Sequence, residues 1–285
     1  MGILRDQMAL ELRLRGYSPK TVQNYLANVE HFVAYFRRPL PELGETEIRQ
    51  YLDYLLSERK LSFSSANLAY SALRFCYQHV LQQPWNIAHL PRAQQGKTLP
   101  EVLSVQEVES LLAHVTHRKY LAILAVIYSA GLRVSEAVHL RVEDIDSKRM
   151  TIRIRQGKGQ QDRYTLLAQR TLHLLRTYFR CYRPSTWLFP GTGKGKPLST
   201  RAVQLAFQEA RVAAGIAKKA TVHTLRHSFA THLLDRGTDI THIRRLLGHR
   251  RLETTAIYLH VTNRDLARLA SPFDRSAHLA PPLPW

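Results

Sequence analysis

Apolar side chains in the first third of the chain recur every three or four positions, the spacing of one buried face of an α-helix. Ser18 and Pro19 are typical of a helix start, and Pro39 and Pro41 predict that this helix ends just before them. The stripe between these limits consists of Val22, Tyr25, Leu26, Val29, Phe32, Val33 and Phe36.

The same spacing predicts three more helices before residue 90. One lies within 1–16, one begins at Thr46, and one covers about 64–81. The residues expected to face inward are Ile48, Tyr51, Leu52 and Leu55 in the middle helix and Leu68, Ala72, Phe75 and Cys76 in the last. Residues 1–90 are therefore predicted to form a small four-helix bundle.

No apolar period runs through residues 91–100, where proline, glycine and basic residues predict a linker. Ser104 and Glu107 then form a capping box that starts a new helix. The nearly continuous apolar run from Tyr120 to Ala130 predicts a helix at the centre of a second core, ended by Gly131 in the left-handed conformation.

A period of two follows in 151–155 and again in 163–166, on either side of a glycine-rich turn. This pattern predicts an antiparallel hairpin with Ile152 and Ile154 facing inward. Further helices are expected around Leu172, Leu175, Tyr178 and Phe179, from about 199 to 213, and within 222–248. The predicted fold is mainly α: a helical domain over 1–90, a linker over 91–100, a mostly helical domain with a small antiparallel sheet over 101–270, and a tail over 271–285.

Charge narrows the range of partners. The 285 residues include 41 Lys and Arg against 22 Asp and Glu, and 29 of the basic residues but only 14 of the acidic ones follow Lys97. Such an excess favours nucleic acid, although a ribosome-like or membrane-surface protein has a similar charge. No run of apolar residues approaches the roughly 18 residues of a membrane span. The chain has only two cysteines, Cys76 and Cys181, and they are far apart in the sequence. A disulfide framework is therefore not expected, which makes a reducing cytoplasm the expected compartment.

Residues 222–261 gather groups that suit phosphodiester chemistry. His223 and Arg226 are three apart on a predicted helix, His249 follows Gly248, and Tyr258 comes nine residues later. A phenol can serve as a nucleophile, and guanidinium groups match phosphate oxygens in pairs. Upstream, Arg133 and Glu136 follow the buried helix, and Lys158 occupies the predicted hairpin turn, where it could protonate a leaving oxygen.

Each of these residues also has an ordinary structural explanation. Arg133 could form a simple ion pair with Glu136, Lys158 could be a solvated turn residue, and Tyr258 could be a core aromatic. His249 could stabilise a helix C-terminus. His223 and His227 are four apart, but without an acidic or cysteine partner we expect no metal site. The segment 191–196 lacks the spacing of a phosphate-binding loop.

Taken together, the order Arg133, Lys158, His223-x-x-Arg226, Leu247-Gly248-His249 and Tyr258 resembles the tyrosine recombinase (phage integrase) family. The resemblance extends from Ser18 to Val261. It implies that Tyr258 attacks a DNA phosphate to give a 3′-phosphotyrosyl bond and a free 5′-hydroxyl. Arg133, Arg226, His223 and His249 would hold the phosphate, Lys158 would be the acid, His223 would accept the tyrosine proton, and Glu136 would support the first arginine.

The resemblance also implies the partners. These are double-stranded DNA and a homotetramer assembled on two DNA sites, with no cofactor, metal or membrane. The C-terminal segment around Leu266, Leu269 and Phe273 is expected either to dock on a neighbouring protomer or to fold back on its own domain. Further DNA contacts are expected from basic residues of the second domain: Arg153, Arg155, Arg163, Arg250 and Arg251.

Two departures concern the biological role. Arg250 and Arg251 stand where many Xer-like relatives carry Ser-Asp, and the insertion typical of integron integrases is not evident. We therefore expect a site-specific recombinase that serves a mobile element as integrase or transposase. The alternatives are a DNA-binding accessory protein with a relic site and a relaxing enzyme like a type IB topoisomerase.

Overall fold

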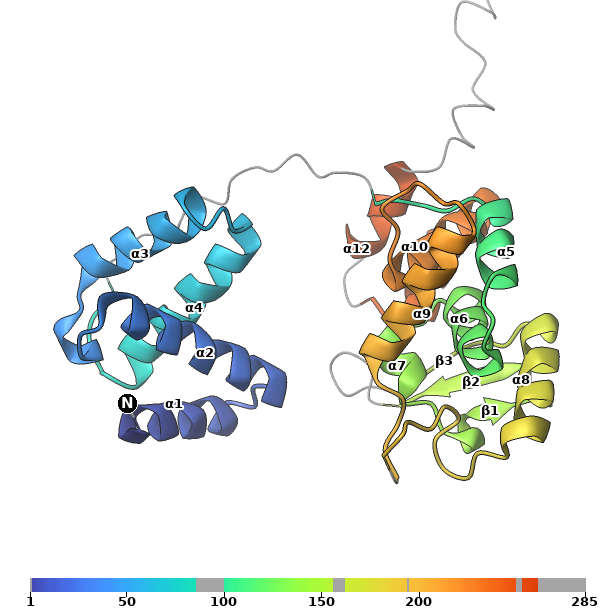
Figure 1. Ribbon diagram of the computed structural model, residues 1–285, viewed down its shortest axis with the longest axis horizontal. Coiled ribbons are helices and arrows are strands. Elements are labelled where there is room, and N and C mark those ends of the chain that lie inside the picture. Colours follow the sequence, from blue (N-terminus) through green and yellow to red (C-terminus); the bar gives the residue numbers. More distant parts are fainter. Residues whose placement is uncertain (1, 86–99, 156–161, 194, 250–252, 261–285) are drawn as a thin grey trace, which may run out of the picture. The chain divides into compact units, whose positions relative to one another are not determined.

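A computed structural model describes residues 2–85, 100–155, 162–193, 195–249 and 253–260 (Figure 1). The chain divides into two compact units, residues 1–98 and 99–285. The predicted tail and all but the last residue of the predicted linker lie outside the described residues. No helix in the described ranges is long and apolar enough to cross a membrane.

The N-terminal unit is a bundle of four α-helices, as predicted. They are α1 (Gly2–Leu14), α2 (Pro19–Phe36), α3 (Glu45–Ser57) and α4 (Phe63–His79), with a 3-10 turn, η1 (Leu40–Glu42), between α2 and α3. The Ser18 hydroxyl accepts a hydrogen bond from the Thr21 amide at 3.2 Å and so caps α2. Helix α4 packs against the other three helices, which encloses the core.

Two details of the prediction for this unit are wrong. Helix α3 is capped at Gly44 rather than started by Thr46, because the Glu47 carboxylate accepts the Gly44 amide at 2.8 Å. Leu68 is 36% exposed instead of facing inward. Ala66 and Ala69 are the buried residues on that turn of α4, so the packed face lies beside Leu68 and not on it.

The C-terminal unit is mostly helical, with a small sheet. Its helices before the sheet are α5 (Val105–Ala113), α6 (Arg118–Ala130), α7 (Val134–Val138) and the 3-10 turn η2 (Val142–Asp144). The helices after it are α8 (Gln169–Tyr182), α9 (Thr200–Ala213), α10 (Val222–Asp235), α11 (Ile240–Leu247), α12 (Glu253–Ala256) and the 3-10 turn η3 (Ile257–His260).

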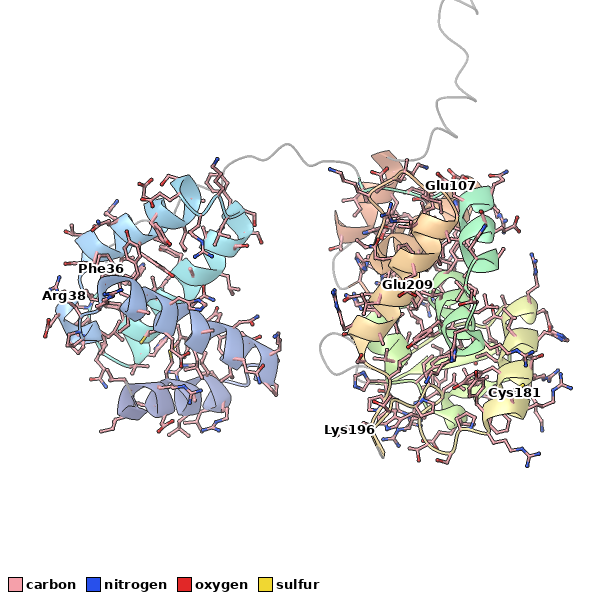
Figure 2. All side chains as sticks on the ribbon, in the orientation of Figure 1. Phe36, Arg38, Glu107, Cys181, Lys196 and Glu209 are labelled. Atoms are coloured by element: carbon pink, nitrogen blue, oxygen red, sulfur yellow. The ribbon has the colours of Figure 1, made fainter. Side chains whose placement is uncertain are left out.

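Helix α6 is the centre of this unit, as its apolar sequence predicts. It packs against α5, α7, α8, α9, α10 and strand β3, and its residues from Ala122 to Ile127 are all buried. Gly131 ends it with φ 65°, the left-handed cap expected from the sequence. The predicted capping box of α5 is present as well, because Ser104 and Glu107 exchange side-chain and backbone hydrogen bonds at 2.6 and 3.1 Å. Figure 2 shows Glu107 at the start of α5.

The sheet contains three antiparallel strands in the order β1 (Ile145–Asp146), β2 (Thr151–Ile154) and β3 (Arg163–Leu166). Ile152 and Ile154 face the core, as predicted. The two-residue strand β1 was not predicted, since it is too short to show a period. The Thr165 hydroxyl donates to the Ala130 carbonyl at 2.9 Å and ties β3 to the end of α6.

Helix α8 differs from its prediction at one position. Tyr178 is buried, but Phe179 is 40% exposed because the neighbouring position takes the inward face. Cys181 near the end of this helix is exposed (Figure 2), whereas Cys76 is buried in the N-terminal unit, and both thiols are free.

Candidate active site

Helix α10 carries three of the polar residues in the site. Its first turn is closed by the Thr224 hydroxyl, which accepts the Thr221 amide at 3.0 Å. His223 lies at the exposed start of the helix, Arg226 is buried one turn later, and His227 is half-buried beside it. Because α10 packs against α6, α9, α11 and η3, these side chains are held within the C-terminal unit.

Arg226 is a buried arginine that joins the ends of two other helices. Its Nη1 donates to the Gly131 carbonyl and its Nη2 to the Leu247 carbonyl, each at 2.7 Å. These carbonyls terminate α6 and α11, where a cation is favoured by the helix dipoles. Burial, followed by the charge of Arg133, lowers the pKa of Arg226 to about 10, so the guanidinium still carries its charge at neutral pH.

Glu136 holds three guanidinium groups together. Arg133 Nη1 lies 2.7 Å from Oε1, Arg163 binds both carboxylate oxygens at 2.9 Å, and Arg226 Nη1 lies 3.6 Å from Oε2. Burial alone raises the pKa of Glu136. The hydrogen bonds and charge of Arg163, the Arg133 amide and the charge of Arg226 outweigh it and hold this pKa at about 2. Glu136 is therefore ionised and fixes the position of the cations.

Arg133 is the most accessible of the arginines around Glu136. Its side chain is 25% exposed, against 12% for Arg163 and 1% for Arg226. Arg133 lines a groove of about 680 Å³ together with Ser135, His139, Arg141, Arg155 and Trp187. Its guanidinium can thus meet a phosphate that approaches from solvent while Arg226 holds the inner end of the site.

His249 lies beside Arg226 at the turn that ends α11. Gly248 adopts φ 65°, and His249 Nε2 lies 3.1 Å from Arg226 Nη2. An arginine can only donate, so Nε2 accepts and the ring proton is on Nδ1, which lies 2.9 Å from the Thr255 hydroxyl. Burial and the charges of Arg226, Arg133 and Arg163 lower the pKa of His249 to about 4. Thr255 lies inside α12 and is the hydroxyl partner of His249.

Tyr258 lies in η3 and is 1% exposed. Its ring packs with Phe229, Ile243 and Leu247, but its hydroxyl is not surrounded by hydrocarbon, because Oη lies 3.0 Å from His227 Nδ1. Burial raises the pKa of Tyr258, while the charges of Arg226 and Arg133 act in the opposite direction. The phenol is thus protonated at neutral pH and lies within the electrostatic influence of the arginines.

His223 and His227 are neighbours on α10. Their rings meet edge to face with centroids 4.5 Å apart. Partial burial and then the charges of Arg226 and Arg133 lower the pKa of His223. The sequence suggested His227 only as a metal partner of His223, and its contact with Tyr258 was missed because 31 residues separate the two. Among the described residues, no group of three or more His, Cys, Asp or Glu could hold a metal ion.

The remaining predicted contacts are placed as follows. Arg153 is paired with Asp162 at 2.7 Å, and Arg155 is paired with Asp144 at 2.7 Å and with Glu143 at 2.9 Å. Arg163 also donates to the Leu246 carbonyl at 3.0 Å, which links β3 to α11. The other three, Lys158, Arg250 and Arg251, lie outside the described residues. The site thus brings together Arg133, Glu136, His223, Arg226, His249 and Tyr258.

Comparison with known proteins identifies the family. Residues 101–264 match the phage integrase family, and residues 4–87 match the N-terminal SAM-like domain of phage integrases. An integrase/recombinase from Sinorhizobium fredii is 42% identical over 285 residues, covering 100% of this chain and 92% of the relative. The tyrosine recombinase XerC of Halalkalibacterium halodurans is 32% identical, with 90% of this chain and 93% of the relative covered.

Comparison with solved structures finds recombinases of similar fold. A crystal structure of the XerH site-specific recombinase in a post-cleavage complex with palindromic difH substrate superposes with a TM-score of 0.74 at 24% identity, covering 91% of this chain and 82% of that one. The mainly helical fold with a small antiparallel sheet is thereby confirmed. This chain belongs to the phage integrase family and is a site-specific DNA recombinase of the tyrosine type.

Proposed function

We propose that Tyr258 is the nucleophile that cuts DNA and becomes joined to its 3′ phosphate. One observation carries the proposal: the Tyr258 hydroxyl is bonded to a side chain of α10, the helix that also supplies His223 and Arg226. The phenol and the cations belong to one chain, so the nucleophile acts on the phosphate held by its own protomer. The phosphotyrosine bond retains the energy of the broken phosphodiester. The hydroxyl of a second strand can therefore form a new phosphodiester without hydrolysis of a nucleotide such as ATP.

The other residues stabilise the charge that builds on the phosphate. Arg133 binds a non-bridging oxygen from the open groove, while Arg226 acts from the inner side and His223 from the exposed start of α10. His249 joins them in its other tautomer: when Nδ1 accepts the Thr255 hydroxyl, the ring proton is on Nε2 and is donated to a phosphate oxygen that replaces Arg226 at this nitrogen. Single donors to a developing oxyanion are worth about 3 kcal/mol elsewhere, so a ring of four supplies a large share of the rate. Glu136 orients Arg133, and His223 accepts the tyrosine proton. Lys158, outside the described residues, protonates the leaving 5′ oxygen.

Double-stranded DNA is the partner that suits this site and the basic charge of the C-terminal unit. Arg153, Arg155, Arg163, Arg250 and Arg251 are proposed to strengthen its binding. Arg153 and Arg155 do so after exchanging carboxylate partners for phosphates, while Arg163 adds its charge and stays paired with Glu136. The N-terminal helical unit grips the same DNA. The biological role we propose is integration or transposition of a mobile element, in the cytoplasm, where the DNA is.

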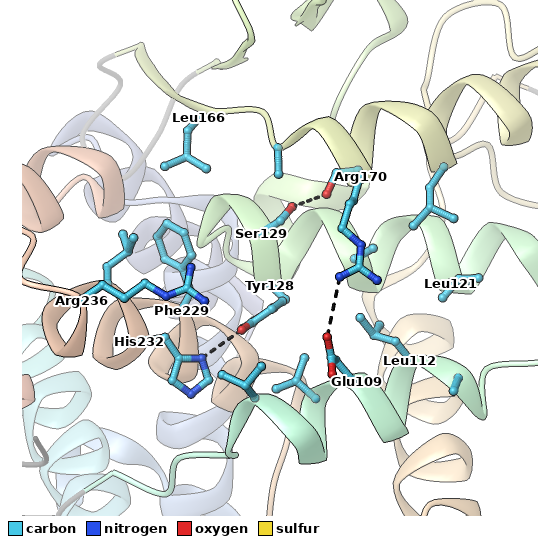
Figure 3. A pocket seen from close by; sticks show the side chains of 18 residues that line it. Glu109, Leu112, Leu121, Tyr128, Ser129, Leu166, Arg170, Phe229, His232 and Arg236 are labelled. Carbon is cyan, nitrogen blue, oxygen red and sulfur yellow. Dashed lines mark hydrogen bonds and ion pairs between the residues drawn. The ribbon is translucent and has the colours of Figure 1, made fainter.

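Recombination between two sites requires several protomers, and we propose a tetramer that exchanges C-terminal segments. A cavity of about 720 Å³ lies between α5, α6, α8 and α10 (Figure 3). Its lining includes Leu112, Leu121, Leu174, Phe229 and Leu233, and Glu109 and Arg170 form an ion pair of 3.6 Å across one side. The segment with Leu266, Leu269 and Phe273 has the apolar side chains to fill this cavity on a neighbour.

The test is recombination in a cell that expresses the intact chain, followed by sequencing of the DNA junctions, with Tyr258→Phe as the inactive control. Reciprocal junctions at defined sites are expected from the intact chain and none from the control. A salt-sensitive complex with DNA but no junctions would indicate an accessory protein. Relaxation of any supercoiled DNA without exchange between sites would indicate a topoisomerase-like enzyme.

A further inference from the structure

The contact between His227 and Tyr258 supports the assignment of the nucleophile, but His227 itself has none of the roles assigned above. His227 lies on α10 next to Arg226, and its Nδ1 is 3.0 Å from the Tyr258 hydroxyl. The two rings are tilted by 54° with their centroids 5.7 Å apart, so the contact is made through the polar atoms and not by stacking. His223, on the other side, meets the edge of the His227 ring.

We propose that His227 is the positioning residue of the nucleophile: it holds the Tyr258 hydroxyl toward the arginine-lined site so that the oxygen is aligned when a phosphate binds. This inference rests on the proposed role of Tyr258. It adds a residue that acts through Tyr258. The acceptor of the tyrosine proton is still His223.

The anchoring of Tyr258 explains why one more contact matters. Its ring is fixed among Phe229, Ile243 and Leu247, and the start of its segment is fixed by the hydrogen bond between Thr255 and His249. The packing of the ring fixes the position of Oη, but it does not set the orientation of the O–H bond or of the oxygen lone pairs. The hydrogen bond to His227, on the helix that carries Arg226, sets both. Alignment of this kind is worth much in rate, since a displacement of about 1 Å can cost roughly a hundredfold.

The charge state of His227 agrees with a fixed hydrogen-bond partner. Burial, then His223 and then Arg226 lower the pKa of His227 to about 4, so the ring is neutral at neutral pH. A neutral imidazole with its proton on Nδ1 donates to the phenol oxygen, so the phenol O–H stays free to pass its proton to His223 and a remaining lone pair of the oxygen attacks phosphorus. The other neutral tautomer would take the phenol O–H at Nδ1 and draw the proton to His227.

Two substitutions separate positioning from proton transfer. His227→Ala removes the contact. His227→Asn keeps a side-chain amide that can donate a hydrogen bond near the place of Nδ1 but cannot take up a proton. The substrate is a nicked duplex carrying the recombination site identified by junction sequencing. The measured quantities are the dissociation constant for this DNA, the rate of covalent adduct formation at saturating DNA, and the pH dependence of that rate.

A matched control accounts for the loss of a buried histidine. His232, on the same helix, makes an equivalent bond from Nδ1 to the Tyr128 hydroxyl at 2.9 Å. His232→Ala is expected to lower the unfolding temperature about as much as His227→Ala does. Because His232 also lines the cavity between α5, α6, α8 and α10, the rates are compared on DNA that binds a single protomer. Equal unfolding temperatures with unequal rates of adduct formation would therefore place the effect at Tyr258 and not in general destabilisation.

We expect His227→Ala to slow adduct formation at saturating DNA about ten- to a hundredfold with little change in DNA affinity, and His227→Asn to restore most of the rate. The pH dependence of the rate in His227→Asn should keep the shape of the wild-type curve. The inference is overturned if His227→Ala reacts at the wild-type rate. It is also overturned if His227→Asn is as slow as His227→Ala and loses the pH dependence, which would make His227 the proton acceptor. No adduct with the wild-type chain would overturn the proposed function itself.

Discussion

At the scale of single residues, the site depends on one carboxylate. Glu136 touches the guanidinium groups of Arg133 and Arg163 and lies near that of Arg226, although these come from α7, β3 and α10. Three like charges so close together would repel one another in a buried setting. A single buried anion with a pKa of about 2 offsets this repulsion and leaves a net positive site for a phosphate.

Glu136→Gln should therefore destabilise the C-terminal unit in a pH-dependent manner. The folded pKa lies below the unfolded value of about 4.3, so the ionised carboxylate contributes stability above that value, and the contribution is lost as the pH falls toward 2. A shift of this size corresponds to about 3 kcal/mol. Urea unfolding of both forms should show this difference at pH 7 and a smaller one near pH 3.

Glu143→Gln is the matched control, because Glu143 binds Arg155 on the surface with 62% of its side chain exposed. Its loss should cost less than about 1 kcal/mol. Equal effects of the two substitutions at pH 7 would contradict the role given to Glu136.

Thr255→Val tests the bond that ties the tyrosine segment to His249. The substitution keeps the shape of the buried side chain and leaves His249 Nδ1 without its hydroxyl partner. A hydrogen bond of this kind is worth about 1 kcal/mol, so we expect roughly a fivefold slower adduct formation. Thr254→Val changes an exposed neighbour and should leave the rate as it is; if both variants react alike, Thr255 does not orient His249.

At the scale of elements, the site is assembled by helix ends. Arg226 receives the carbonyls that end α6 and α11, and both helices stop at a glycine with φ 65°. The glycines also allow close packing. A Cβ on Gly131 would lie 2.4 Å from the Phe229 ring, and one on Gly248 would lie 2.8 Å from the Arg163 side chain.

Gly131→Ala should consequently destabilise the C-terminal unit by about 2–5 kcal/mol, combining left-handed strain of about 1–2 kcal/mol with overpacking against Phe229 of about 1–3 kcal/mol. Gly215→Ala is the control, since Gly215 has φ 68° but open space around its Cβ position. This substitution should lower the free energy of unfolding only by the left-handed strain. Denaturant unfolding distinguishes the two, and equal losses would show that the approach of Phe229 is unimportant.

The elements themselves were largely predictable, because hydrophobic periodicity and caps are local. The central helix α6, its glycine end and the hairpin with Ile152 and Ile154 inward all follow from the sequence. Features set by tertiary packing were not. The short strand β1 depends on pairing with β2, and the partner of Tyr258 depends on how η3 packs against α10. Nothing in the local sequence distinguishes His227 from other histidines that follow a buried arginine, so its contact with Tyr258 could not be predicted.

At the scale of the whole molecule, charge and assembly could be predicted only in outline. Most of the excess positive charge follows Lys97, so the sequence indicates which part of the chain lies against a polyphosphate. The arginines nevertheless have carboxylate partners that no local pattern reveals, such as Asp162 for Arg153 and Asp144 for Arg155. The cavity of about 720 Å³ is likewise built from α5, α6, α8 and α10, of which only α5 and α6 are neighbours in the sequence.

Removal of residues 262–285 tests the proposed exchange between protomers. A chain ending at Val261 should still bind a single DNA site, because the residues that hold the phosphate remain. It should fail to form the complex of four protomers on two sites, since the cavity between α5, α6, α8 and α10 stays empty. Electrophoretic mobility and sedimentation of the DNA complexes measure both properties. Assembly equal to that of the full chain would contradict the proposed exchange of the segment.

The most direct test of the central claim is to trap the covalent intermediate on a nicked DNA substrate and locate the attachment by mass spectrometry. The account predicts a DNA 3′-phosphate linked to the peptide that contains Tyr258, and Tyr258→Phe that binds the same DNA without forming the adduct. An adduct formed by Tyr258→Phe, or attachment at any other residue, would contradict it.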